Sequence, residues 1–155
     1  MRALIEELES EFAGVEARLR SLLDATPETL LFAKPFPGGR TMIAISAGGC
    51  IIRAAAMIEQ AFLGITRRLW DDPFEWTLPE ELSTREAILE YLDEVLDTRK
   101  KGMAFLISDA DLTRQLPAPE ALRSIFAVLI EALLRAEHFL GKAEVLMRAA
   151  DHSRV

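Results

Sequence analysis

The residue types most often used for chemistry are scarce in this chain of 155 residues, which has one cysteine and two histidines. His138 is a candidate general base, because an imidazole exchanges protons near neutral pH. Cys50 follows two glycines at the expected start of a helix, where the helix dipole lowers the pKa of a thiol and favours the nucleophilic thiolate. The spacing assembles no Ser-His-Asp or Cys-His-Asp set. We therefore expect a packing role for Cys50 and a surface position for His138.

The histidine count also limits metal binding. A three-histidine site needs three imidazoles that converge on one point, and the second histidine, His152, lies in a polar C-terminal tail. Three histidines therefore cannot converge within one subunit. A site that combines His138 with the carboxylates of Glu59 and Glu131 is the remaining alternative. We predict no metal and no other cofactor.

Apolar residues recur with the helical period along nearly the whole chain, and they predict four long helices. The first has roughly twenty residues, and Thr26 before Pro27 predicts the N-cap of a short helix after it. A breaker-rich loop at 34–39 precedes the second helix, which begins within 41–46 and ends near Arg68. The apolar face of the first helix consists of Leu4, Leu8, Phe12, Val15, Leu19 and Leu22.

The second half of the chain carries the other two long helices. A capping box at 83–86 (Ser-Thr-Arg-Glu) predicts that the third helix begins at Ser83. Acidic residues and prolines between Asp109 and Pro119 end it, and the fourth helix covers roughly residues 119–149. No segment alternates with the period of two of a half-buried strand, which favours an all-α, single-domain four-helix bundle. The buried face of the third helix consists of Ile88, Leu92, Val95, Leu96, Met103 and Leu106.

Two further segments are open to more than one interpretation. Trp70 and Trp76 lie in the long connection between the second and third helices, where they could seal one end of the bundle or line a ligand site, and we expect the structural, sealing role. The fourth helix is apolar on more than one face, at 126–130 and 133–134. That pattern suits a central bundle helix, a homodimer contact or a protein interaction module.

Composition narrows the class of protein. The 25 acidic and 18 basic residues give a net charge of −7, which opposes the phosphate backbone and disfavours nucleic-acid binding. Charge or glycine interrupts each apolar run before the length that a membrane crossing needs. The single cysteine excludes an internal disulfide, and the acidic N-terminal segment is unlike a secretory signal. We expect a soluble, cytoplasmic protein.

Three segments carry a resemblance to the DinB-like family of bacterial four-helix bundles. Residues 46–53 (Ser-Ala-Gly-Gly-Cys-Ile-Ile-Arg) match the Ser-x-x-Glu-Cys-x-x-His pattern of the family at the serine and the cysteine. Residues 140–144 (Leu-Gly-Lys-Ala-Glu) resemble the Leu-x-Gln-Ala-Glu that follows the His-x-x-x-His motif in one branch of the family. Residues 106–112 resemble the Leu-x-Asp-x-Asp-Leu motif of the family. The resemblance implies an up-down-down-up bundle with short accessory helices in the connections.

The resemblance also implies that an ancestral metal site has been lost. Family members hold a divalent metal with one histidine from the second helix and two from the fourth, and this chain is expected to place Arg53, Arg135 and Phe139 there. Neither a guanidinium nor a phenyl ring has a lone pair to donate to a metal. His138 falls one residue off this register, about 100° round the helix.

Two arginines at these positions leave two alternatives. They could bind a small anionic ligand bidentately, assisted by Gly48 and Gly49 at a helix N-terminus, or they could pair with the chain's own carboxylates. Glu131 lies one turn before Arg135, and Glu59 could approach Arg53. We favour internal pairing. The function hypotheses are a non-catalytic or anion-binding DinB-like protein, a hydrolase or thiol-dependent transferase working without metal, and an interaction module.

Overall fold

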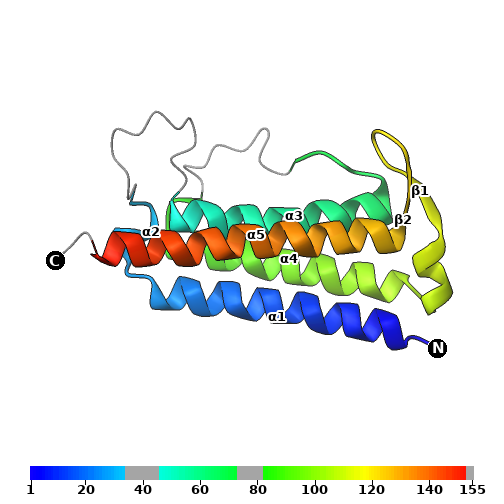
Figure 1. The fold of residues 1–155 in the computed structure, drawn as a ribbon, viewed down its shortest axis with the longest axis horizontal. Coiled ribbons are helices and arrows are strands. Elements are labelled where there is room, and N and C mark those ends of the chain that lie inside the picture. Colours follow the sequence, from blue (N-terminus) through cyan, green and yellow to red (C-terminus); the bar gives the residue numbers. More distant parts are fainter. Residues whose placement is uncertain (34–45, 73–81, 153–155) are drawn as a thin grey trace.

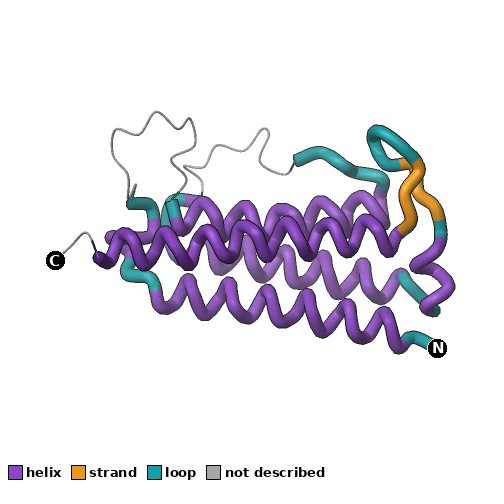
Figure 2. Tube along the Cα trace, in the orientation of Figure 1, coloured by secondary structure: helices purple, strands orange, loops and turns teal. Residues whose placement is uncertain are grey.

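Four long helices packed side by side, with a small β-hairpin at one end, make up the computed structural model of the chain (Figures 1 and 2). The structure describes residues 1–33, 46–72 and 82–152. The long helices are α1 (Ala3–Ala25), α3 (Ala47–Arg67), α4 (Arg85–Phe105) and α5 (Ile125–His152). The short elements are α2 (Glu28–Leu31), the 3-10 helix η2 (Asp109–Thr113), and strands β1 (Gln115–Pro117) and β2 (Leu122–Ser124).

The helices run in two opposite pairs. α1 and α5 run in one direction, and α3 and α4 run in the other (Figure 1). Because α3 and α4 are parallel, the connection between them must return along the length of the bundle, and residues 68–72 form the described start of that return. α3 packs against both α5 and α4, and it positions the side chains considered below.

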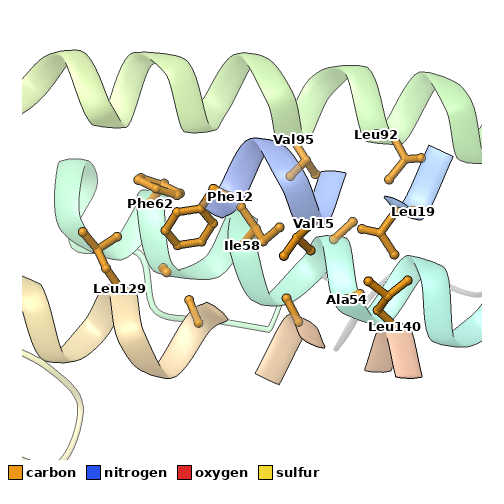
Figure 3. Packing of buried hydrophobic residues seen from close by; sticks show 14 of the residues in the cluster. Phe12, Val15, Leu19, Ala54, Ile58, Phe62, Leu92, Val95, Leu129 and Leu140 are labelled. Atoms are coloured by element: carbon orange, nitrogen blue, oxygen red, sulfur yellow. The ribbon is translucent and has the colours of Figure 1, made fainter. Parts of the chain in front are cut away.

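The core is a continuous cluster of aliphatic and aromatic side chains from all four long helices. Phe12 of α1 and Phe62 of α3 meet edge to face, with ring centroids 5.1 Å apart. Ile58 of α3 lies beside them, and Leu129 and Leu140 reach in from α5 (Figure 3). Burial of these side chains holds the helices together.

α3 is apolar on nearly all sides, because it lies against several helices at once. Its length and composition would also suit a membrane span, contrary to the sequence expectation, although 67% of its most apolar stretch is buried within the protein. Packing in the bundle accounts for this composition.

Side-chain caps mark the start of three long helices, α3, α4 and α5. The Ser46 hydroxyl accepts a hydrogen bond from the Gly49 amide at 3.1 Å, so the N-cap of α3 lies at the late end of the range 41–46 predicted for its start. The predicted cap of α4 was wrong by one residue, because Thr84 rather than Ser83 accepts from the Ala87 amide at 3.2 Å. The neighbouring hydroxyls offer similar caps, and the sequence pattern did not distinguish them.

Thr26 is not an N-cap, contrary to the sequence prediction. It is the C-terminal cap of α1, and its buried hydroxyl donates back to the Leu22 carbonyl at 2.6 Å. α2 begins at Glu28 after Pro27, with no side-chain cap. A threonine hydroxyl can bond to the carbonyl four residues earlier, and here that local bond prevailed.

The fourth long helix starts later than predicted, because a hairpin precedes it. β1 and β2 pair antiparallel with Leu116 opposite Arg123, which corrects the expectation of no strands. The Ala118 amide donates to the Ala121 carbonyl across the turn, and Ser124 then accepts from the Ala127 amide at the start of α5. Strands of three residues are too short for their alternation to be recognised.

The buried faces differ from the predicted ones at a few positions. Leu4 is exposed while Ile5 is buried, and Leu96 is only half-buried. The double apolar face of α5 is present, because Phe126 and Leu134 remain exposed on the single chain. The predicted loop at 34–39 and Trp76 lie outside the described residues.

Candidate functional site

A cavity of about 420 Å³ lies between α3, α5 and the tip of the hairpin. Its volume is in the range of small-molecule sites. Its lining combines apolar side chains of α3 and α5 with charged side chains from the hairpin and α5. The lining residues are Met57, Gln60 and Ala61 of α3; Val128, Glu131, Ala132 and Arg135 of α5; and Trp70, residues 118–121 and Arg123.

Trp70 forms one wall of the cavity because the chain folds back after α3. Arg68 ends the helix in the left-handed conformation with φ 58°, and this turns the chain over α3. The Trp70 indole fills the space above Gly64, where an added Cβ would lie 2.2 Å from the ring. Gln60 Nε2 donates to the Trp70 carbonyl at 2.6 Å, and Trp70 Nε1 donates to the Pro117 carbonyl at 3.2 Å. These contacts tie the wall to both α3 and the hairpin.

Two arginines share one carboxylate at the edge of the cavity. Arg135 Nη2 lies 2.5 Å from Glu131 Oε1, and Arg123 Nη1 donates to the other oxygen of Glu131. Arg123 also donates to the Ala127 carbonyl at 3.3 Å. The three side chains are half-buried to exposed, so solvent remains in contact with them. This cluster carries one formal positive charge in excess, and we call it the Arg123–Glu131–Arg135 cluster.

A second charge lies at the hairpin tip. Glu120 is exposed and lines the cavity, and it forms no ion pair with the part of the chain that the structure describes. The cavity lining therefore has an excess positive charge at the Arg123–Glu131–Arg135 cluster and a negative charge at the hairpin tip. Met57, Val128 and Ala132 are among the apolar residues that line the remainder.

Of the side chains singled out from the sequence, Arg135 and Glu131 line the cavity, and so does Trp70, which was expected to have only a structural role. The predicted ion pair of Arg135 with Glu131 is confirmed. Arg53 is half-exposed and lies outside the lining, with Nη1 3.0 Å from Asp72 Oδ2. The expected pairing of Arg53 with Glu59 is wrong, since Asp72 is brought to Arg53 by the returning chain.

Glu59 instead faces α4. Tyr91 Oη donates to Glu59 Oε2 at 2.5 Å. Burial raises the pKa of Glu59, the hydrogen bond from Tyr91 lowers it, and the nearby Glu94 charge raises it. Burial and the Glu59 charge also raise the pKa of Tyr91 well above its ordinary value. The pair joins α3 to α4 and does not belong to the cavity.

Cys50 is fully buried in the core, as the packing interpretation predicted. Burial raises the pKa of its thiol, with a smaller opposing effect from Lys142. The dipole-lowered thiolate considered from the sequence is therefore wrong. Gly48 has a packing role rather than a ligand-binding one, because an added Cβ would lie 2.8 Å from the Leu31 carbonyl oxygen.

His138 is exposed on α5, as expected. Its ring meets Phe139 edge to face at 5.6 Å between centroids, and the Lys142 ammonium lies 5.5 Å from the centre of the Phe139 ring. Neither ring lines the cavity. Within the described ranges, no three His, Cys, Asp or Glu side chains converge in a way that could hold a metal ion.

Comparisons of the chain with protein-family models, curated proteins and solved structures gave no match. The site must therefore be interpreted from its own geometry. Sequence reasoning did not single out Arg123, Glu120 or Gln60. Residues 120 and 123 were assigned to a helix that in fact begins at Ile125, and their signal was the proline-containing turn at 117–119.

Proposed function

We propose that this protein binds a small amphipathic carboxylate in the cavity between α3 and α5. The observation that carries the proposal is the Arg123–Glu131–Arg135 cluster, in which two guanidinium groups share a single carboxylate. Arginine binds carboxylates through two parallel hydrogen bonds, and Glu131 leaves donors of both arginines for a ligand. The apolar lining suits a hydrocarbon body.

Binding without catalysis fits the lining better than an enzyme does. A hydrolase or thiol-dependent transferase needs an activated nucleophile or a poised base next to the substrate. The buried Cys50 and the exposed His138 lie outside the lining, and no serine, threonine, lysine or tyrosine of the described residues belongs to it. Among the described residues, the carboxylates of Glu120 and Glu131 are the anionic groups of the lining, and Glu131 is engaged by two arginines.

We also propose that the chain is a divergent DinB-like protein, an up-down-down-up bundle that has lost a three-histidine metal site. Three features support this: the opposite helix pairs, the long return between α3 and α4, and the short elements in the connections. The start of α3 at Ser46 agrees with the register on which the resemblance depends.

The binding proposal is tested by titrating the protein with caprylate and following heat by calorimetry. Arg135→Ala should weaken binding about tenfold, because a charge-assisted hydrogen bond contributes on the order of 1.5 kcal/mol. Arg18→Ala is the matched control, since Arg18 is a half-exposed arginine of α1 that pairs with Glu137. Equal losses of caprylate affinity in the two variants would contradict the proposal.

The Trp70 wall provides a second variant for the same titration. Gly64→Ala should displace the indole and weaken caprylate binding, because the new methyl group would occupy the position of the ring. Gly141→Ala is the matched control, since nothing lies within 4 Å of an added Cβ there. It should leave binding unchanged and stabilise α5 by up to about 1 kcal/mol.

A further inference from the structure

We propose that the ligand of the cavity is a zwitterion, with a carboxylate at one end, an ammonium group at the other and an apolar body between them. The inference rests on the proposed binding function and specifies its ligand class. The carboxylate would meet Arg123 and Arg135, and the ammonium group would meet Glu120 at the hairpin tip.

The charges of the lining support this assignment. Arg123 and Arg135 together with Glu120 and Glu131 sum to zero, but the charges are not evenly distributed. Glu131 is bound to both arginines, while Glu120 forms no ion pair with the described residues. The lining therefore carries a dipole of charge, with an excess positive charge at the arginines and a negative charge at the turn.

A dipolar cavity discriminates among ligands by charge pattern. A simple carboxylate would satisfy the arginines but would bring a second negative charge towards Glu120. A simple amine would meet Glu120 but would bring a positive charge towards the arginines. A zwitterion complements both ends, and selection against the singly charged analogues follows from the like-charge contacts that they create.

The apolar side chains of the lining define the body of the ligand. Met57 and Ala61 of α3 and Val128 and Ala132 of α5 line the cavity. Methylene groups are favoured there, because they exclude water from apolar side chains. Hydroxyl groups on the body are disfavoured, because they would lose hydrogen bonds to water. The ligand class is thus an amino acid whose charged groups are separated by a hydrocarbon chain.

The position of Glu120 keeps its effect modest. The side chain is exposed at a turn, so its attraction for an ammonium group is weakened by water. A contact of this kind corresponds to a factor of about five in affinity. The arginines supply the larger part of binding, and Glu120 supplies the preference between zwitterion and carboxylate.

The test uses two matched pairs of probes, caproate with ε-aminocaproate and caprylate with ω-aminocaprylate, titrated into the full chain. We expect at least one amino acid to bind about fivefold more tightly than its matched carboxylate. In Glu120→Gln this preference should disappear, and the plain carboxylates should bind more tightly because the like charge is gone. Glu11→Gln removes an exposed carboxylate from α1, which does not line the cavity, and it should preserve the preference.

The outcomes separate the two proposals. The zwitterion proposal would be overturned if the carboxylates bind at least as tightly as their amino analogues and Glu120→Gln leaves the ratio of the two affinities unchanged. The binding function would remain intact. No binding of any of the four probes would overturn the binding function itself. Equal effects of Glu120→Gln and Glu11→Gln would show that only net charge matters, and would also overturn the assignment of Glu120.

Discussion

At the scale of single residues, the Glu59–Tyr91 pair shows how burial and a hydrogen bond act against each other. Burial disfavours the charged form of Glu59, whereas the hydroxyl of Tyr91 donates to the carboxylate and favours it. The burial effect is the larger, so the pKa of Glu59 in the folded protein lies above its ordinary value. Folding therefore favours the protonated carboxyl group.

This sets the sign of a pH dependence. The stability that Glu59 contributes is fully present below its unfolded-state pKa of about 4.3, and it is lost as the pH rises through the higher folded-state pKa. Glu59→Gln keeps an acceptor for Tyr91 and cannot ionise. As the pH rises from about 4 to about 7, the free energy of unfolding of this variant should increase relative to that of the unmodified protein, as measured by urea unfolding.

Tyr91→Phe provides the complementary measurement. It removes the hydrogen bond that lowers the pKa of Glu59, so the loss of stability with rising pH should be steeper than in the unmodified protein. A stability difference between Glu59→Gln and the unmodified protein that stays constant over this pH range would show that the carboxyl group ionises equally in both states.

At the scale of elements, α1 and α4 are joined by a buried ion pair. Arg99 of α4 is 3% exposed, with Nε 2.9 Å from Glu16 Oε1 and Nη1 3.4 Å from Glu9 Oε1. Glu16 is also buried, and its Oε2 atom has no hydrogen-bond partner among the described residues. In the sequence Arg99 belongs to a short basic run. Only the tertiary structure shows that Arg99 is buried while its neighbours in the run are solvated.

Glu16→Ala should cost about 3–5 kcal/mol of unfolding free energy, because Arg99 would keep its buried charge without its closest partner. Asp97→Ala is the matched control on α4: Asp97 forms an exposed pair with Lys101 at 2.6 Å, and its loss should cost less than about 1 kcal/mol. Chemical denaturation measures both. Equal and small losses of unfolding free energy in the two variants would show that Glu9 or water stabilises the buried charge of Arg99.

At the scale of the whole molecule, the antiparallel packing of α3 and α5 tests the proposed ancestry. The N-terminal half of α3, which includes position 53, lies beside the C-terminal half of α5 (Figure 1), and the two helices pack against each other. Arg135 and Phe139 are four residues apart, so they lie on the same side of α5. The proposed three-histidine site would require position 53 of α3 to converge with these two positions of α5.

Changing Arg53, Arg135 and Phe139 together to histidine should therefore create zinc or nickel affinity, measured by calorimetry and elemental analysis. The matched control changes Arg53, Leu134 and Phe139 instead, since positions 134 and 139 lie about 140° apart round a helix. This control should bind metal more weakly than the first variant, although the two variants have the same number of histidines. Equal metal binding by the two variants, or none by either, would remove the support for the family register.

The helices and some of their boundaries were predictable because they depend on local interactions. Apolar residues with a period of 3.6 indicated four long helices, and the Ser46 cap acts on an amide only three residues away. The Glu131–Arg135 pair was predictable for the same reason, because helix geometry brings residues four apart together. The hairpin was missed, since strands of three residues carry too little pattern.

What the sequence determined by itself is thus the helical class, the buried positions in outline, and the contacts within one helical turn. The tertiary structure decided which charges meet: Arg53 with Asp72, Glu59 with Tyr91, and Arg123 with Glu131. It also decided that Trp70 fills the space above Gly64 and closes a cavity. These partners are brought together by the packing of helices and the return of connections, and contacts of that kind leave no periodic signal in the sequence.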